Sequence, residues 1–255
     1  MISKLASSLF RMIPENGFKN SLRAFIHRRL YKEYKTYYRN NIWELHYPGF
    51  SIKYKDVPSP ALVNYLFFKN FTDRKFDIII DAGGFMGTYG FLMAKKYPAA
   101  RIYIYEADPT NFQRIKENLV LNDISNVIIE PLGLWDKKDK LKMSIGNDLG
   151  SSIVNEKSSN ATVEIDVTSL DAYFPNERNK LVFIKMNIEG AEIAALNGAK
   201  TFMANNQVDL NICTDHFVDG ELTYIAVEKI FADEKMPYQT LRDGIHINTH
   251  ATNIK

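Results

Sequence analysis

Short apolar runs alternate with amphipathic stretches from residue 76 to the end of the chain. Five runs are continuous and rich in β-branched residues, as strands buried on both faces of a sheet are. They cover residues 76–81, 101–106, 126–130, 181–186 and 208–213. Stretches with helical periodicity separate them, at residues 88–96, 110–121, 192–206 and 222–233. This order predicts an α/β fold, with a doubly wound, mostly parallel sheet and helices on both faces.

The segment from Leu132 to Leu170 departs from this alternation. It contains lysine-rich turns, a glycine-containing turn at residues 146–150 and a polar stretch at residues 158–160. Such a composition is typical of turns rather than of buried strands. We predict a hairpin-like insertion or a mobile loop over the functional site.

The N-terminal region has the pattern of a helical arm. Apolar residues recur at helical spacing within residues 2–13, and a second helical pattern runs from Phe18 to Tyr38 before Tyr47-Pro48-Gly49 breaks it. We therefore predict a basic helical extension over residues 1–70, followed by an α/β domain over residues 71–255.

Positive charge is concentrated in this arm. The chain of 255 residues has a formal net charge of +2, whereas residues 1–56 carry 11 Lys/Arg against 4 Asp/Glu, so the remainder is net acidic. A basic amphipathic segment can rest on an anionic membrane surface or contact a partner. It can equally pack on the main domain with its charges in solvent, and this is the arrangement that we favour.

Cysteine usage and the lack of long apolar runs indicate the compartment. The single cysteine, Cys213, rules out an internal disulfide and a multi-thiolate zinc site, and it fits a reducing compartment. The first residues lack a secretory signal pattern, and no run approaches the roughly 18 apolar residues of a membrane span. We expect a cytoplasmic protein, with peripheral membrane contact through residues 1–56 as the alternative.

A glycine-rich turn follows the first strand of the α/β part. Residues 81–87 are Asp-Ala-Gly-Gly-Phe-Met-Gly, and a helix is predicted directly afterwards. Gly83, Gly84 and Gly87 would let a ligand approach the backbone, and a helix N-terminus presents free N–H groups to an anionic group. Asp81 would receive a ligand ammonium, directly or through water. Because the dinucleotide fingerprint G-x-G-x-x-G is absent, the turn suits the amino-acid part of S-adenosyl-L-methionine better than a pyrophosphate.

The second strand ends at an acid, Glu106. An acid at this place can accept both hydroxyls of a ribose, as in nucleotide-binding Rossmann units, and Glu106 is our candidate ribose ligand. Asp108 precedes Pro109 and instead has the pattern of a helix N-cap. Trp135 is a candidate either for the wall of an adenine site or for the core.

Further candidates follow the fourth and fifth strands. Asn187 and Glu189 should border the reaction site, because ligands of doubly wound folds bind outside the carboxyl ends of the strands. His216 follows the fifth strand, with equal grounds for a site role and a structural role. Cys213 is expected in the core rather than as a nucleophile. The other histidines, at positions 27, 46, 246 and 250, are expected in surface or packing roles.

Several of these motifs together resemble the FkbM-type methyltransferase family. The resemblance joins the glycine-rich turn to E-x-x-P at residues 106–109, S-L-D at 169–171, I-K-x-x-x-E-G-A-E at 184–192 and L-x-G-A at 196–199. It covers roughly residue 76 to the end of the chain. It implies a Rossmann-like methyltransferase that uses S-adenosyl-L-methionine for O-methylation of a hydroxyl on a sugar, glycan or other small metabolite.

Three positions depart from the family's pattern. Phe85 stands where the family usually has Asn, Asn187 where it usually has Asp, and Thr214 where it tends to have an acid. The first change implies an altered wall of the cofactor site, and the second bears on the catalytic group. A non-catalytic member that binds cofactor, a membrane or a partner therefore stays open, as does an NAD-dependent oxidoreductase on the same fold.

The expected reaction needs a group that removes the hydroxyl proton of the acceptor. We predict His216 as this base, because the unperturbed pKa of histidine lies nearest to neutrality. Glu189 would position the acceptor or hold its loop through backbone hydrogen bonds, and the Asn187 amide would orient a ligand. The sequence has no zinc motif, phosphate loop or N-P-P-aromatic signature, so we expect no metal and no nucleic-acid partner.

Overall fold

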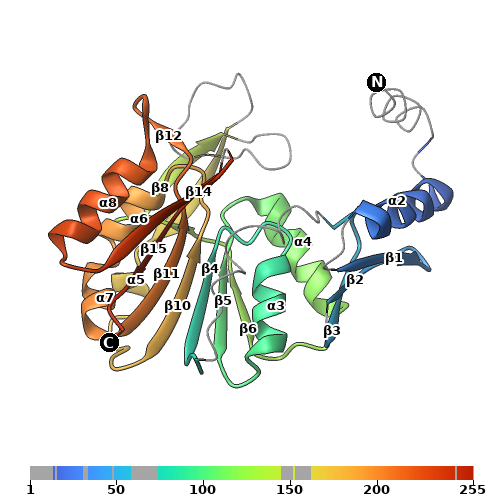
Figure 1. The fold of residues 1–255 in the computed structure, drawn as a ribbon, viewed down its shortest axis with the longest axis horizontal. Coiled ribbons are helices and arrows are strands. Elements are labelled where there is room, and N and C mark those ends of the chain that lie inside the picture. The colour runs from blue at the N-terminus through green and yellow to red at the C-terminus, as the bar shows by residue number, and fades with distance from the viewer. Residues whose placement is uncertain are drawn as a thin grey trace.

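The computed structural model of the protein describes residues 14, 16–30, 34–47, 49–58, 74–144, 152, 162–244 and 246–254. Its centre is a seven-stranded sheet in the order β14-β15-β11-β10-β4-β5-β6 (Figure 1). These strands are β4 (Ile78–Ala82), β5 (Arg101–Tyr105), β6 (Val127–Glu130), β10 (Leu181–Met186), β11 (Gln207–Cys213), β14 (Tyr238–Asp243) and β15 (His246–Thr252).

The sheet is doubly wound, as predicted. Strands β6, β5, β4, β10 and β11 are parallel, and β15 runs antiparallel to both β11 and β14. The chain moves outward from β4 through β5 to β6 and then returns to β10 on the other side of β4, so the strand order reverses between β4 and β10. Ligands of such sheets bind outside the carboxyl ends of the strands at this reversal.

Alternate residues of the central strands supply two cores. In β4, Ile78 and Ile80 face one side of the sheet and Ile79 faces the other, as the two-residue period of a strand requires. Helices α3 (Thr88–Lys96) and α4 (Pro109–Val120) cover the Ile79 face (Figure 1). The opposite face is covered by α5 (Leu170–Tyr173), α6 (Glu192–Asn197), α7 (Lys200–Asn205) and α8 (Thr223–Asp233).

The helix predicted over residues 192–206 is interrupted. Helix α6 ends at Asn197 and α7 begins at Lys200, with Gly198 between them. A Cβ atom on Gly198 would lie 2.3 Å from the carbonyl oxygen of Trp135. The chain therefore breaks the helix where the backbone after β7 (Gly133–Leu134) passes close to it.

The N-terminal arm is only partly helical. Helix α2 (Gly17–Leu30) is present, but the helix prediction is wrong from residue 35 to residue 38, because a three-stranded antiparallel sheet begins there. Its strands are β1 (Lys35–Arg39), β2 (Ile42–Tyr47) and β3 (Phe50–Tyr54). Asn40 and Asn41, with φ of 50° and 61°, form the two-residue connection typical of a β-hairpin. The helix predicted over residues 2–13 lies outside the described residues.

The three-stranded sheet packs on the main domain. Trp43, Leu45 and Ile52 are buried in the same core as helix α3. Hydrogen bonds also join the ends of β3 and α4. The Lys53 N–H donates to Asn122 Oδ1 over 2.9 Å, and the Lys55 N–H donates to Asn118 Oδ1 over 3.0 Å. The described strands of the arm therefore share a core with the α/β domain.

The segment between β6 and α5 contains the predicted hairpin. Strands β8 (Asp139–Ser144) and β9 (Thr162–Thr168) pair antiparallel, and β9 also pairs with β7. The turns predicted at residues 146–150 and 158–160 lie outside the described residues.

A two-stranded sheet of β12 (Phe217–Val218) and β13 (Glu221–Leu222) precedes α8. Within the described part of the chain, no helix is long and apolar enough to cross a membrane.

Candidate active site

The glycine-rich turn lies where the strand order of the sheet reverses, and close packing requires glycine at several of its positions. Gly83 and Gly87 have left-handed φ angles of 81° and 83°. A Cβ atom on Gly83 would lie 2.0 Å from the carbonyl oxygen of Asn187, and one on Gly84 would lie 2.3 Å from Cγ2 of Ile104. These glycines therefore let the turn contact the end of β10 and the side of β5.

Asp81 has different partners from the ligand ammonium that we expected. Its side chain is fully buried, and Oδ1 lies 2.9 Å from Nζ of Lys185 while Oδ2 accepts the Gly90 N–H over 3.0 Å. Burial raises the pKa of the Asp81 carboxyl, against the opposing effect of Lys185. Lys185 Nζ also donates to the carbonyl of Gly83 over 2.8 Å. The pair ties β10, the turn and α3 together, so direct contact of Asp81 with a ligand is not available in this arrangement.

Glu106 is a nearly buried carboxyl at the end of β5. Its Oε2 accepts the Phe85 N–H over 2.7 Å, and its Oε1 accepts the Asp108 N–H over 2.9 Å. Burial raises its pKa to about 7, and the two backbone N–H bonds act in the opposite direction. A carboxylate has about four acceptor positions, so two remain for ligand hydroxyls. The geometry is compatible with the ribose role that we predicted.

Phe85 adopts a left-handed backbone conformation, with φ of 53°. Such a conformation is uncommon for a bulky residue, whereas Asn and Gly adopt it readily. It points the Phe85 N–H at Glu106, and the phenylalanine ring packs on the core beneath α3. The left-handed backbone at this position therefore explains why asparagine suits it in the family that the sequence resembles.

The turn after β10 carries Asn187 and Glu189. The Asn187 N–H donates to the carbonyl of Ala82 over 3.0 Å, which attaches the turn to β4. The Asn187 Oδ1 atom is buried and has no hydrogen-bond partner among the residues that the structure describes. A buried carbonyl oxygen without a donor is costly, so this atom is suited to receive an N–H or O–H of a ligand. Glu189 has a left-handed φ of 56° and a side chain that is 34% exposed.

Glu192, and not Glu189, holds this turn through backbone hydrogen bonds. The Glu192 side chain is fully buried, and its two oxygens accept the N–H groups of Ile188 over 2.9 Å and Gly190 over 3.0 Å. Our expectation for Glu189 is corrected on this point. Glu189 and Gly190 both have positive φ, and the hydrogen bonds to the Glu192 carboxylate stabilise this conformation.

His216 lies among three carboxylates. Its Nδ1 is 3.1 Å from Oε1 of Glu192, in a charge contact that is not aligned as a hydrogen bond. Its Nε2 is 3.7 Å from Glu189 Oε2 and 3.9 Å from Asp215 Oδ1. Burial of the ring lowers its pKa, but Glu192 and Glu189 outweigh that effect and raise the pKa to about 10. A ring protonated at neutral pH has no lone pair for a hydroxyl proton, so the structure does not supply the neutral histidine that the predicted base role needs.

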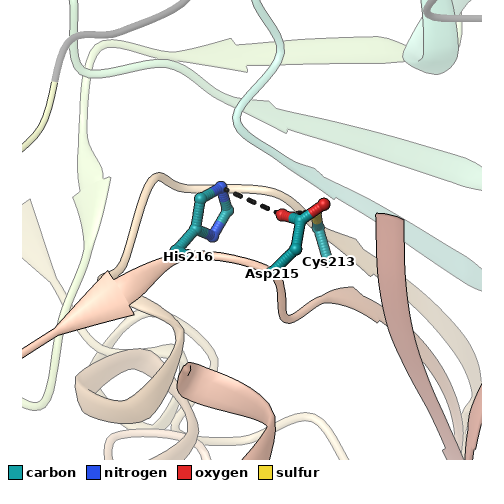
Figure 2. A group of neighbouring side chains, drawn as sticks. All are labelled: Cys213, Asp215 and His216. Carbon is teal, nitrogen blue, oxygen red and sulfur yellow. Dashed lines mark hydrogen bonds and ion pairs between the residues drawn. The ribbon is translucent and has the colours of Figure 1, made fainter. Parts of the chain in front are cut away.

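Cys213, Asp215 and His216 form a cluster at the end of β11 (Figure 2). The Cys213 Sγ lies 3.0 Å from Asp215 Oδ1, and the other Asp215 oxygen lies 3.2 Å from Nδ1 of His246. Burial, followed by the Asp215 carboxylate, raises the pKa of the Cys213 thiol, which agrees with the expectation that it is not a nucleophile.

Sequence reasoning missed several of these partners. Lys185 and Glu192 were part of the quoted I-K-x-x-x-E-G-A-E motif but received no role, although a charged residue inside an apolar strand is a signal of a buried pair. The contact of His246 with Asp215 had no sequence signal, because it depends on the antiparallel pairing of β15 with β11. Trp135 and Ala107 both pack against the small core of the hairpin between β8 and β9.

Comparisons with known proteins add a family. A family model for the methyltransferase FkbM domain matches residues 87–241, more than half of the chain. Methyltransferase 1 of Beauveria bassiana (strain ARSEF 2860) is 25% identical over 175 residues, which are 57% of this chain and 70% of that protein. Methyltransferase sdnD of Sordaria araneosa is 26% identical over 176 residues, which are 52% of this chain and 68% of that protein.

A solved structure agrees in fold. The crystal structure of methyltransferase FkbM from Methylobacillus flagellatus KT superposes with a TM-score of 0.54 at 18% sequence identity. The match covers 78% of this chain and 49% of that one, so the chain spans about half the length of this structural relative. The Rossmann-like fold predicted from the sequence is thereby confirmed.

Proposed function

The chain belongs to the FkbM methyltransferase domain family, and from this premise we propose that it transfers a methyl group from S-adenosyl-L-methionine to a hydroxyl oxygen of a sugar, glycan or other small metabolite. The observation that carries the proposal is the pair of acceptor groups at the sheet reversal. Glu106 and the unpartnered Asn187 Oδ1 lie at the ends of β5 and β10, which flank β4 and its glycine-rich turn.

The residues at this edge fit the cofactor. Glu106 has acceptor positions left for the two hydroxyls of a ribose, and Asn187 Oδ1 is suited to accept from the ammonium of the amino-acid part. Gly83 and Gly87 keep the turn in a left-handed conformation that brings its backbone to this edge. When bound, the cofactor supplies a sulfonium methyl group that is intrinsically reactive toward a nucleophile.

The protein's own part in the reaction is to orient the acceptor and to remove its proton. We assign proton acceptance to Glu189, because its carboxylate is partly exposed at the carboxyl end of β10 and the Glu192 bonds fix its backbone. We keep His216 in the site as the charged group that positions Glu189. This differs from the base role predicted from the sequence.

The insertion from Leu132 to Leu170, together with the N-terminal arm, is our candidate for acceptor recognition. Within the insertion, Ser152 donates from Oγ to the carbonyl of Glu189 over 2.8 Å, so this residue contacts the turn after β10. Ser152 also pairs with Ser144 at the end of β8. An acceptor bound at Glu189 would therefore lie next to residues of the insertion.

Helix α2 is our candidate for the peripheral membrane contact that the sequence analysis leaves as the alternative. Phe18, Phe25 and Ile26 are 70%, 48% and 36% exposed, so this helix presents three large apolar side chains to solvent. The Arg29 guanidinium lies over the Phe25 ring at 5.0 Å, so apolar and basic groups share this surface. A surface of this kind suits an anionic lipid layer.

Two measurements test the proposed function. Calorimetry should show binding of S-adenosylmethionine or its homocysteine product and no comparable binding of NAD; tight NAD binding alone would establish the oxidoreductase alternative instead. Mass spectrometry of glycans and small metabolites from a deletion strain should show one class that has lost a methyl group. Binding without any such loss, and without turnover on those fractions in vitro, would favour a non-catalytic role.

Glu189→Gln should lower turnover by about 100-fold while cofactor affinity stays nearly unchanged. Asn187→Ala should instead weaken cofactor binding, because it removes the acceptor oxygen. Normal turnover in Glu189→Gln would reject Glu189 as the proton acceptor.

A further inference from the structure

Four side chains with metal-binding groups meet where β10 and β11 end. Cys213 is the last residue of β11, Asp215 and His216 follow it, and Glu189 lies in the turn after β10. The Cys213 Sγ, an Asp215 oxygen and a His216 nitrogen all lie within 4.8 Å of one another (Figure 2). Glu189 Oε2 lies 3.7 Å from the same His216 nitrogen, Nε2, that faces Asp215.

His216 has carboxylates on both sides of its ring. Its Nδ1 faces the fully buried Glu192 carboxylate at 3.1 Å, and two backbone N–H bonds hold that carboxylate in place. Histidines that bind metals commonly have a carboxylate at the second ring nitrogen, which fixes the ring. The other ring nitrogen, Nε2, faces Asp215 and Glu189, and a positive charge between these carboxylates, either the His216 proton or a bound cation, lowers their repulsion.

We propose that this cluster binds one divalent ion of the Zn²⁺ class through Cys213 Sγ, Asp215 Oδ1 and His216 Nε2, with Glu189 beside the fourth position. A mixed sulfur, nitrogen and oxygen set favours such an ion over Mg²⁺ or Ca²⁺, which prefer oxygen ligands alone. This revises the absence of a metal that we expected from the sequence.

Two of the three distances between the ligand atoms can be compared with those of a tetrahedral site. Bonds of about 2.0–2.3 Å in a tetrahedral site place ligand atoms roughly 3.3–3.7 Å apart. The Cys213 Sγ to Asp215 Oδ1 distance is 3.0 Å, and the Asp215 Oδ1 to His216 Nε2 distance is 3.9 Å, so each changes by a few tenths of an ångström. On binding, the Cys213 thiol and a protonated His216 Nε2 each release a proton to solvent, and no electron is transferred.

The site also has a consequence for catalysis, which rests on the proposed function. An acceptor hydroxyl that coordinates the ion at its fourth position would become more acidic, because metal ions lower the pKa of bound oxygen groups. Glu189 lies beside that position and would take the proton. The ion would then replace the positive charge that the His216 proton supplies in its absence.

Titration of the full chain with Co²⁺ alone, without cofactor or acceptor, tests the proposal. Cys213 is the only cysteine, so a thiolate-to-cobalt charge-transfer band can arise from that residue alone. We expect one Co²⁺ per chain with this band, displacement by Zn²⁺ and no displacement by millimolar Mg²⁺. Cys213→Ser should abolish the band, and His216→Ala or Asp215→Asn should weaken Zn²⁺ binding by at least about tenfold.

His250→Ala is the matched control. His250 pairs with Asp209 on the same sheet and does not belong to the cluster, so its loss should leave Zn²⁺ affinity unchanged. Circular dichroism verifies that each variant is folded. The absence of the band, or Zn²⁺ binding that survives both His216→Ala and Asp215→Asn, would overturn the site. Because cofactor and acceptor are absent, this result is separable from a failure of methyl transfer.

Discussion

Cofactor binding should depend on pH through Glu106. The perturbation is a change from pH 8 to pH 6, made in the natural protein and in Glu106→Gln. Burial raises the pKa of Glu106 to about 7, despite the N–H bonds from Asp108 and Phe85. Ribose hydroxyls donate hydrogen bonds, so they favour the ionised carboxylate. Binding should therefore weaken as the pH falls through about 7.

The magnitude follows from that pKa. A group with a pKa of about 7 is ionised in roughly nine-tenths of molecules at pH 8 and in roughly one-tenth at pH 6. If only the ionised form binds, Kd rises about tenfold over this interval, or about 1.4 kcal/mol. Binding at pH 6 should then release close to one proton per cofactor, because the bound carboxylate stays ionised.

Calorimetry with the homocysteine product at pH 6, 7 and 8, in buffers of different ionisation enthalpy, measures both quantities. Glu106→Gln removes the titrating group. Its Kd at pH 8 should therefore be higher than that of the natural protein, and it should be nearly independent of pH. Glu117→Gln on α4 is the matched control: Glu117 pairs with Lys55 at the surface over 3.1 Å and does not act on the pKa of Glu106. A Kd that is flat from pH 6 to 8 in the natural protein would refute the reasoning, as would an unchanged slope in Glu106→Gln.

The same shift has an opposite consequence for the free protein. A carboxyl whose pKa is raised on folding is less readily ionised in the native state than in the unfolded chain. Its contribution to the free energy of unfolding therefore falls as the pH rises from about 4.5 to about 7, by about 3 kcal/mol. Ligand hydroxyls at Glu106 would offset part of this loss, so the cofactor should stabilise the protein more at pH 8 than at pH 6.

Three further changes test the packing of the site and the surface of the arm. Both Phe85→Asn and Phe85→Ala lose the ring, but Asn tolerates the left-handed φ of 53° better than Ala does. The free energy of unfolding measured in urea should therefore be about 1 kcal/mol higher for Phe85→Asn than for Phe85→Ala. Equal stabilities would contradict the argument from the backbone conformation. Glu192→Ala should lower the free energy of unfolding by about 3 kcal/mol, since it leaves the Ile188 and Gly190 N–H groups and the His216 charge without their buried partner. Loss of less than 1 kcal/mol would mean that water replaces the carboxylate. Phe18→Ser with Phe25→Ser should reduce sedimentation with anionic vesicles by about fivefold or more; Val120→Ser, at a position 86% exposed on α4, is the control, and equal effects would reject a membrane role for α2.

Strand and helix positions of the α/β part were predictable because the sheet is buried on both faces. Residues 181–186 form a continuous apolar run apart from Lys185, and β10 covers those same residues. The arm was less predictable, because Tyr37 and Tyr38 suit a helix face as well as a strand. The Asn40-Asn41 turn was the signal that a hairpin begins there, and helical spacing in the preceding residues concealed it.

The candidate site divides in the same way. Residues at strand ends were predictable, because the fold places them at one edge: Glu106, Asn187 and Glu189 all lie there. Their protonation and pairing were not, because these depend on groups brought together only in three dimensions. His216 illustrates this, since its pKa depends on Glu192 and Glu189, which approach it from the neighbouring strand's turn.

Two of the three departures from the family's pattern, those at Phe85 and Asn187, have different structural meanings, and together they support the proposed site. At Phe85 the group directed at Glu106 is the backbone N–H, which any residue supplies, so the side-chain change leaves the Glu106 contact in place. At Asn187 the amide keeps a buried oxygen where a carboxylate would have one, and that oxygen has no partner within the described residues. A chain that had lost its ligand would gain stability by closing or pairing such an atom. A buried oxygen without a donor, in the same turn as Glu189, is expected of a site that receives a ligand.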